Sequence, residues 1–206
     1  MDRAPLTFKR LVGLDRSGPP AEETLPGQPL RPWTIPNLIG YLRLAGIPVF
    51  LALALQSDSG TDVVPAILFA AIAFGDYFDG MAARATGQYS RLGSLLDPLV
   101  DRLLVIAGII VCWKYDTLPH WAIAIMLARE IVLLLAGQAQ ARRGTAIEIN
   151  WLGRLAVWPT MSGIFFALAG VEELAVPLFL IGVAMALVAA VFYVRAAVSG
   201  AAKPAR

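Results

Sequence analysis

Six apolar stretches dominate the pattern of hydrophobic and polar positions along the chain. A helix needs roughly 20 apolar residues to cross the ~30 Å hydrocarbon core of a bilayer, and each stretch is close to that length. The predicted helices cover residues 34–55, 62–85, 94–113, 119–140, 151–170 and 174–197. Because only short loops join them, neighbouring helices are expected to be antiparallel and to form a compact bundle.

The composition favours the same fold class, an all-α integral membrane protein with six transmembrane helices. Hydrophobic residues make up 58% of the 206 positions, and the mean hydropathy is +0.67. A soluble helical bundle of this length is the alternative, but it would lack the interior to bury so much apolar surface. Cys112 is the only cysteine and His120 the only histidine, which excludes an intrachain disulfide and a histidine-rich metal site.

A polar, proline-rich segment precedes the first apolar stretch, and no cleavable signal peptide is evident. Residues 1–33 are predicted to form a partly disordered cytoplasmic segment. Within it, residues 5–14 alternate apolar and basic positions, and they either lie on the membrane surface or form a frayed tail. Residues 34–197 are predicted to be the transmembrane catalytic domain, and residues 198–206 a cytoplasmic tail.

Positive charges predict the orientation of the bundle, because basic residues concentrate on the cytoplasmic side of membrane proteins. With the N-terminus inside, the cytoplasmic segments hold Arg3, Lys9, Arg10, Arg16, Arg31, Arg84, Arg91, Arg142, Arg143, Arg195, Lys203 and Arg206. The opposite side holds only Lys114, beside Asp58, Asp62, Asp116, Glu172 and Glu173. The sequence therefore predicts a multi-pass protein of the cell membrane with a cytoplasmic N-terminus.

Four aspartates stand in or at the ends of apolar stretches: Asp76, Asp79, Asp97 and Asp101. An ionised carboxylate near hydrocarbon costs on the order of 3 kcal/mol or more, so such acids are functional candidates. The spacing of three between the first two and of four between the last two puts each pair on one helix face. A short cytoplasmic connection turns the two faces toward each other, where converging carboxylates would repel unless cations bound among them. All-oxygen ligation suits Mg²⁺, Mn²⁺ or Ca²⁺.

The neighbours of the aspartates indicate a phosphate ligand. Gly80 and Ala83 leave one side of the helix bare, so that a ligand can approach the backbone. Arg84 offers a fork of donors for phosphate, and Ser90 in the loop is a candidate polar contact. Taken singly, the small residues could serve only helix packing, and an aspartate could pair with an arginine such as Arg102. Neither alternative explains the whole set at these intervals.

The stretch from Asp76 to Asp101 reads D-x2-D-G-x2-A-R-x8-G-x3-D-x3-D. It resembles the signature of the CDP-alcohol phosphotransferase (CDP-alcohol phosphatidyltransferase) family at every defined position. Residues 35–38 (IPNL) with Arg43 resemble the opening helix of that family. The resemblance implies six membrane helices, a cytoplasmic N-terminus and active site, and a homodimer. It also implies transfer of a phosphatidyl group from CDP-diacylglycerol to an alcohol with release of CMP, and no nucleic-acid partner.

Residue roles follow from the same resemblance. The four aspartates of the signature would hold two Mg²⁺ ions, with Mn²⁺ as an alternative. Asp101 would contribute to the second ion and also act as general base toward the acceptor hydroxyl. The cytidine diphosphate part would contact Gly80, Ala83, Arg84, Ser90 and Asn37.

Other segments bear on the acceptor alcohol. Arg129-Glu130 and residues 150–154 (NWLGR) resemble the branch of the family that holds the cardiolipin synthases and phosphatidylglycerol-phosphate synthases. Glycerol 3-phosphate users typically continue Gly-Lys-x-Lys-Thr, whereas residues 153–157 read GRLAV. A phosphate monoester carries about two negative charges and would want more cations than this segment offers. Residues 90–98 also look more like the cardiolipin synthases. Phosphatidylglycerol, giving cardiolipin, is therefore the leading acceptor, and glycerol 3-phosphate the alternative.

Arginines are the candidates for the acceptor pocket. Arg129 and Arg154 are predicted to bind the acceptor, although Arg129 could instead form an internal ion pair with Glu130. Arg142 and Arg143 fit a positive-inside anchor at least as well.

Two other classes place acids in membrane helices. A metal or proton transporter usually sets them near the midplane, often in broken helices of paired repeats, and no repeat is evident here. A membrane prenyltransferase also uses aspartates and Mg²⁺, but on helices far apart in sequence. Both fit less well than a phosphatidyltransferase.

Overall fold

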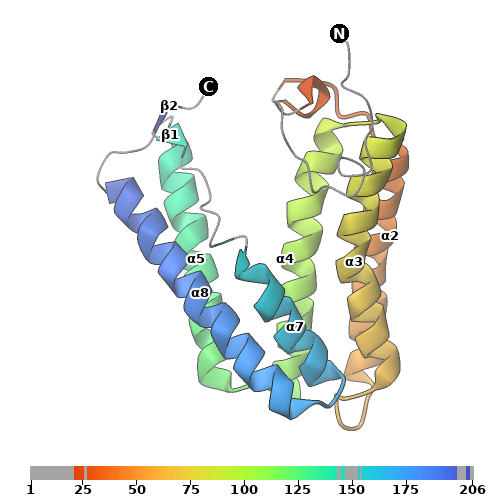
Figure 1. The fold of residues 1–206 in the computed structure, drawn as a ribbon, viewed down its shortest axis with the longest axis vertical. Coiled ribbons are helices and arrows are strands. Elements are labelled where there is room, and N and C mark those ends of the chain that lie inside the picture. The colour runs from red at the N-terminus through yellow and green to blue at the C-terminus, as the bar shows by residue number, and fades with distance from the viewer. Residues whose placement is uncertain are drawn as a thin grey trace. The chain divides into compact units, whose positions relative to one another are not determined.

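The structure, a computed structural model, describes residues 21–25, 27–142, 145–146, 153, 155–198 and 203–204. These residues form six α-helices, one short 3₁₀ helix and one pair of very short strands (Figure 1). The helices are η1 (Glu22–Thr24), α2 (Ile35–Leu55), α3 (Val63–Thr86), α4 (Arg91–Lys114), α5 (His120–Arg142), α7 (Val157–Leu168) and α8 (Glu172–Val198). The strands β1 (Thr145–Ala146) and β2 (Lys203–Pro204) pair antiparallel, with Thr145 opposite Pro204.

The all-helical architecture predicted from the sequence is confirmed, and most helix ends agree closely with the pattern. Helix α4 begins at Arg91, three residues before the predicted start, and the polar Ser90 directly precedes it. Helix α7 is described over Val157–Leu168, inside the predicted 151–170, while residues 151, 152 and 154 lie outside the described residues.

Three of the described helices are long and apolar enough to cross a bilayer: Ile35–Leu55, Val63–Thr86 and Glu172–Arg195 of α8. Large apolar side chains project outward from them, with Leu42 66% and Ile67 62% exposed. Such exposure suits helices surrounded by lipid. The length and composition of these helices are consistent with a membrane protein, while the count of six spans and the side of the N-terminus stay predictions. Helix α4 carries Asp97, Asp101 and Arg102 near its middle, and these charges lower its apolar character.

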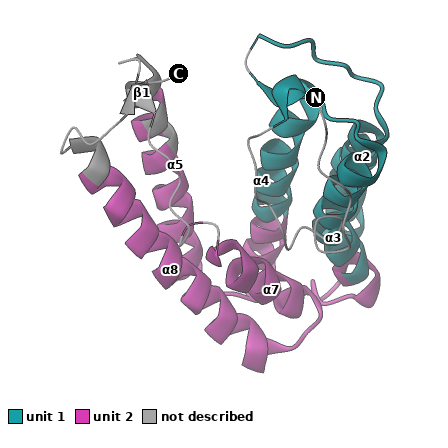
Figure 2. Cartoon of the chain, turned by 45° about the horizontal axis from the view of Figure 1, so that its top comes forward, with its two compact units in different colours: residues 1–56, 67–107 teal, residues 57–66, 108–206 magenta. Residues whose placement is uncertain are grey.

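The chain divides into two compact units, coloured separately in Figure 2. Unit 1 comprises Met1–Gln56 and Ile67–Ala107, and unit 2 comprises Ser57–Ala66 and Gly108–Arg206. Unit 1 therefore holds α2, most of α3 and the first two thirds of α4. Its apolar core includes Phe50 and Phe69, whose ring centroids lie 5.5 Å apart, and the fully buried Val100 and Leu104.

Unit 2 is built on the packing of α8 against α5 and α7. Glycines permit the closest approach: a Cβ on Gly163 of α7 would lie 2.6 Å from the backbone nitrogen of Phe179 on α8. Small residues at helix contacts are typical of membrane proteins, because they let two backbones come together.

The start of α2 and the loop between α3 and α4 determine the geometry of unit 1. Thr34 caps α2 by accepting a hydrogen bond from the backbone of Asn37 at 3.3 Å. Residues 87–90 alone connect α3 to α4, beginning with Gly87 at φ +65°. The Gln88 side chain accepts a hydrogen bond of 2.9 Å from the backbone nitrogen of Ile35. The loop thereby turns α4 back along α3 and ties the turn to the first residue of α2.

Candidate functional site

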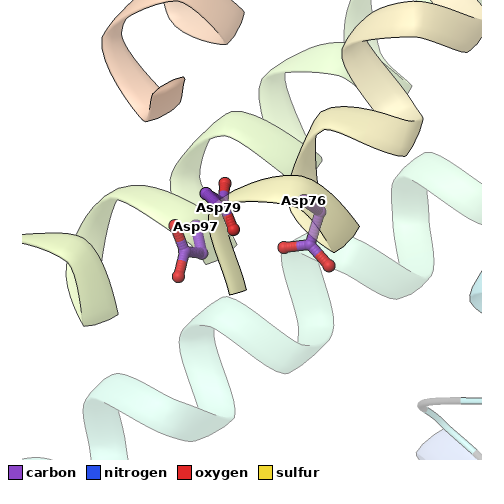
Figure 3. A group of neighbouring side chains, drawn as sticks. All are labelled: Asp76, Asp79 and Asp97. Carbon is purple, nitrogen blue, oxygen red and sulfur yellow. The ribbon is translucent and has the colours of Figure 1, made fainter. Parts of the chain in front are cut away.

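Three of the predicted aspartates come together where α3 and α4 face each other. Asp76 and Asp79 project from α3 and Asp97 from α4 (Figure 3). Each offers one carboxylate oxygen, and these three oxygens all lie within 4.8 Å of one another. Asp79 is buried, Asp97 half-buried and Asp76 exposed. The donor set contains only carboxylate oxygens, which fits a hard divalent cation such as Mg²⁺.

The fourth aspartate, Asp101, lies one helical turn further along α4 and contacts a cation of the protein itself. Its Oδ1 accepts a hydrogen bond of 2.6 Å from Nη2 of Arg43. The other terminal nitrogen, Nη1, donates to Oδ2 of Asp79 at 2.9 Å and lies 3.7 Å from Oδ1 of Asp76. The guanidinium therefore stands among the carboxylates of both helices.

The sequence pattern did not predict a functional role for Arg43. This residue entered only through the resemblance of residues 35–38 and Arg43 to the opening helix of the family. A usable signal existed. Arg43 is the one charged residue within the apolar stretch 34–55, and charges inside membrane helices almost always find a partner. Its partners come from two other helices, so their identity depends on tertiary structure.

A pocket opens beside Asp79 and Asp97, within unit 1. Its lining includes four residues predicted to bind the nucleotide part of a substrate: Gly80, Ala83, Arg84 and Ser90. The remaining lining residues are Thr24, Pro36, Gln88, Tyr89, Gly93 and Ser94. Arg84 lies over Gly80, since a Cβ on that glycine would lie 3.3 Å from Nη1 of the arginine. The pocket thus places the cationic side chain of Arg84 near the carboxylates of Asp79 and Asp97.

Asn37 lies next to this pocket, but the polar atoms of its side chain form hydrogen bonds within the protein. Its amide nitrogen donates to the carbonyls of Arg31 and Pro32 at 2.9 and 3.2 Å. Its Oδ1 accepts a hydrogen bond of 2.8 Å from the hydroxyl of Ser90. Among the described residues, Pro36 rather than Asn37 lines the pocket. The side chain of Asn37 therefore holds the chain before α2 against the loop before α4.

A steric constraint explains why position 93 of the signature is a glycine. A Cβ there would lie 2.8 Å from Oδ1 of Asn37 and 3.2 Å from Oγ of Ser90. Any larger residue would therefore press on the hydrogen bond between these two side chains. The backbone nitrogen of Gly93 also donates to Oγ of Ser90 at 2.9 Å.

The predicted acceptor residues belong to another part of the chain. Arg129 lies on α5 in unit 2, where it forms an ion pair with the adjacent Glu130. This is the internal pairing that the sequence left open. Nε of Arg129 is buried and has no hydrogen-bond partner among the described residues. Arg154 lies outside the described residues, as do Arg143 and the side chain of Arg142.

Comparison with known proteins assigns the chain to a family. The family model described as CDP-alcohol phosphatidyltransferase matches residues 33–198. The chain belongs to the CDP-alcohol phosphatidyltransferase family. The resemblance read from the signature is thereby confirmed, and all four aspartates, Arg43 and the pocket-lining residues from Pro36 onward fall within the matched range.

Curated relatives within this family differ in name. The chain is 38% identical over 133 residues to "Cardiolipin synthase (CMP-forming)" of Streptomyces coelicolor, covering 62% of this chain and 61% of that relative. It is 30% identical over 138 residues to "CDP-diacylglycerol--glycerol-3-phosphate 3-phosphatidyltransferase" of Bacillus subtilis, covering 61% of this chain and 72% of the relative. A Salmonella typhimurium protein of the same name is 30% identical over 176 residues, covering 80% of this chain and 95% of the relative. The first name gives cardiolipin synthesis with formation of CMP, whereas the other two give transfer of a phosphatidyl group to glycerol 3-phosphate.

Proposed function

We propose that the protein transfers a phosphatidyl group from CDP-diacylglycerol to the hydroxyl of a glycerol-type acceptor and releases CMP. One observation carries the proposal: the carboxylates of Asp76, Asp79 and Asp97 meet beside a pocket lined by Gly80 and Arg84. An acidic group able to bind divalent cations, next to an arginine, suits a diphosphate substrate. Family membership supports the same chemistry.

In this proposal Asp76, Asp79 and Asp97 hold two divalent ions, with Asp101 contributing to the second. Bound Mg²⁺, or Mn²⁺ in its place, supplies positive charge that neutralises the diphosphate and its CMP leaving group. The fit rests on the donor chemistry of the acidic group, which is all carboxylate oxygen.

The remaining pocket residues bind and orient the nucleotide part. Gly80 and Ala83 present a bare helix surface, and Arg84 supplies a planar fork of donors for phosphate oxygens. Ser90 lines the pocket directly, whereas Asn37 acts by holding Ser90 at 2.8 Å.

The bond changes are those of a single displacement at phosphorus. The acceptor oxygen forms a bond to the phosphorus of the phosphatidyl group, and the bond from that phosphorus to the oxygen of CMP breaks. Asp101 takes the proton of the acceptor hydroxyl. CMP leaves with the electron pair of the broken bond.

For the acceptor we propose phosphatidylglycerol, which gives cardiolipin as the product. The Streptomyces coelicolor relative supports this choice by its name. Residues 153–157 (GRLAV) also carry only one basic residue where a phosphate monoester would want more. Glycerol 3-phosphate is the alternative, supported by the names of the Bacillus and Salmonella relatives. Arg129 and Arg154 are proposed to contact the acceptor in either case.

The proposed setting is a homodimer in the cell membrane, with six spans and with the N-terminus and active site on the cytoplasmic side. The asymmetry of basic residues supports the orientation.

The deciding experiment offers purified protein CDP-diacylglycerol and Mg²⁺, with phosphatidylglycerol and glycerol 3-phosphate supplied separately. CMP release and the lipid product are followed. Cardiolipin from the first alcohol is expected. Turnover with glycerol 3-phosphate alone would contradict phosphatidylglycerol as the acceptor and identify glycerol 3-phosphate in its place. No CMP from any alcohol would contradict a phosphatidyltransferase and favour a metal or proton transporter.

A further inference from the structure

All three guanidinium nitrogens of Arg43 donate hydrogen bonds to other helices. It stands in the middle of α2 and is only 4% exposed. Its Nε donates to the carbonyl of Ile72 at 2.9 Å, in addition to the hydrogen bonds that Nη1 and Nη2 make to Asp79 and Asp101. One guanidinium therefore links α2 to both helices that carry the aspartates.

The hydrogen bonds use one oxygen of each carboxylate. Arg43 bonds Oδ2 of Asp79 and Oδ1 of Asp101. A planar guanidinium has fixed donor directions, so two simultaneous bonds fix the rotation of both carboxylates. A lysine carries the same charge, but its three donors all stand on one nitrogen at the end of a flexible stem and do not form a rigid planar fork.

Gly75 supplies the space through which the Arg43 side chain passes. A Cβ on Gly75 would lie 2.6 Å from Cδ, 2.7 Å from Cγ and 3.0 Å from Nε of Arg43. Contacts below about 3 Å are not tolerated, so any side chain at this position has to push the arginine aside. The residue directly before the first aspartate of the signature is thus matched in size to an arginine on another helix.

We propose that Arg43 is a positioning residue for the phosphatidyl transfer, and that Gly75 is required to keep it in place. Arg43 holds Asp79 and Asp101 at fixed rotations, so that the metal-binding oxygen and the proton-accepting oxygen face the reacting groups. It also balances part of the negative charge of the cluster before the cations bind. This inference rests on the proposed function of the aspartates and extends it to α2.

The first test replaces Arg43 by lysine in the full-length protein purified in detergent. This variant keeps the positive charge but loses the planar set of guanidinium donors. Its kcat should therefore be lower by roughly 10- to 100-fold, the range typical when the partner of a metal ligand is lost. The KM for CDP-diacylglycerol should stay within about twofold, because the fault lies in aligning groups rather than in binding substrate. Mn²⁺ titration followed by electron paramagnetic resonance should show an affinity roughly 10-fold weaker than that of the wild type.

The second test, Gly75→Ala, keeps every polar group and displaces Arg43 by adding a methyl group on α3. Gly75→Ala should lower kcat by about tenfold, less than the roughly 100-fold that a 1 Å misplacement can cost. Combined with Arg43→Lys, it should add little, since both changes disturb the same contact. Gly40→Ala is the matched control on α2, because its Cβ would meet only Leu96 at an ordinary 3.8 Å. The control should retain wild-type kcat.

The outcomes separate a positioning role from a purely structural one. Wild-type kcat and Mn²⁺ affinity in Arg43→Lys would overturn the proposal, and so would losses in the double variant equal to the product of the two single losses. If Arg43→Lys does not yield folded protein, Gly75→Ala still decides, because unchanged kcat and Mn²⁺ affinity in that variant would also overturn it. If the wild type releases no CMP, the proposed function fails, while the Mn²⁺ titrations still test Arg43 without turnover.

Discussion

Glycine serves two different purposes in the two units of this protein. In unit 1, Gly75 of α3 makes room for the charged side chain of Arg43, and Gly93 of α4 makes room for the hydrogen bond between Asn37 and Ser90. In unit 2, Gly163 of α7 faces the backbone of Phe179 on α8. The first two positions shape a polar site, whereas the third brings two apolar helices together.

The difference shows how to separate function from stability in a helical membrane protein. A methyl group added beside a polar network displaces donors and acceptors whose alignment the chemistry needs. The same methyl group added between two apolar helices forces the backbones apart and costs packing energy. A methyl group at Gly75 or Gly93 should therefore change catalytic constants, and a methyl group at Gly163 the free energy of unfolding.

The largest effect should come from removing the divalent cations proposed to bind among Asp76, Asp79 and Asp97 of unit 1. Excess EDTA is expected to reduce CMP release to background, because the diphosphate and the four aspartates would then repel each other, with only Arg43 and Arg84 of the residues described at the site to offset their charge. Adding Mg²⁺ back should restore the activity. Turnover that persists in excess chelator would contradict the metal site.

Asp101→Asn should lower turnover by about 10²- to 10⁴-fold, because an amide cannot accept the proton of the acceptor hydroxyl. Binding of radiolabelled CDP-diacylglycerol in micelles should stay close to the wild-type level. Asp58→Asn, the same change in an exposed loop residue of unit 2, is the control and should retain activity. Near-normal turnover of the Asp101 variant would refute its role as base.

Gly163→Ala tests the other side of the comparison. Its Cβ would lie 2.6 Å from the backbone nitrogen of Phe179, so the free energy of unfolding should fall by about 1–3 kcal/mol. Reversible unfolding in detergent mixtures, followed by circular dichroism, measures the change. The kcat per folded molecule should not move. A fall in kcat at unchanged stability would remove the distinction between the units.

Ser90→Ala should have the smallest effect. It removes the hydrogen bond to Asn37 and leaves a buried amide oxygen with one partner fewer, at a cost of about 1 kcal/mol in the free energy of unfolding. Ser94→Ala is the control, since this exposed hydroxyl bonds the carbonyl of Arg91, three residues earlier on the same helix, at 2.8 Å. Equal stability of the two variants would show that the Asn37–Ser90 contact contributes nothing to unit 1.

Much of the fold could be predicted because helix formation in this chain depends on local pattern. Residues 34–55 and 62–85 were predicted as helices, and the structure has Ile35–Leu55 and Val63–Thr86. The start of α4 was less accurate, because Arg91 and Leu92 carry no signal that separates a helix start from a polar loop. Its position depends on the hydrogen bonds of Ser90, which involve Asn37 of another helix.

The candidate site was predictable where the residues that form it lie close together in the sequence. Asp76 and Asp79 share a helix face by their separation of three, and the short loop before Asp97 brings the second helix to them. By contrast, the hydrogen bond between Asp101 and Arg43 could not be predicted, because these residues stand 58 positions apart on different helices.

The sequence by itself determined the apolar helices, the membrane as solvent, the signature from Asp76 to Asp101, and with it the family. These are properties of composition and of short intervals, which a helix converts directly into shared faces. Only the tertiary structure decided which cation stands among the carboxylates and why the residue before Asp76 is a glycine. A guanidinium inside a bundle has to bond to whatever acceptors neighbouring helices present, and that depends on how α2, α3 and α4 pack.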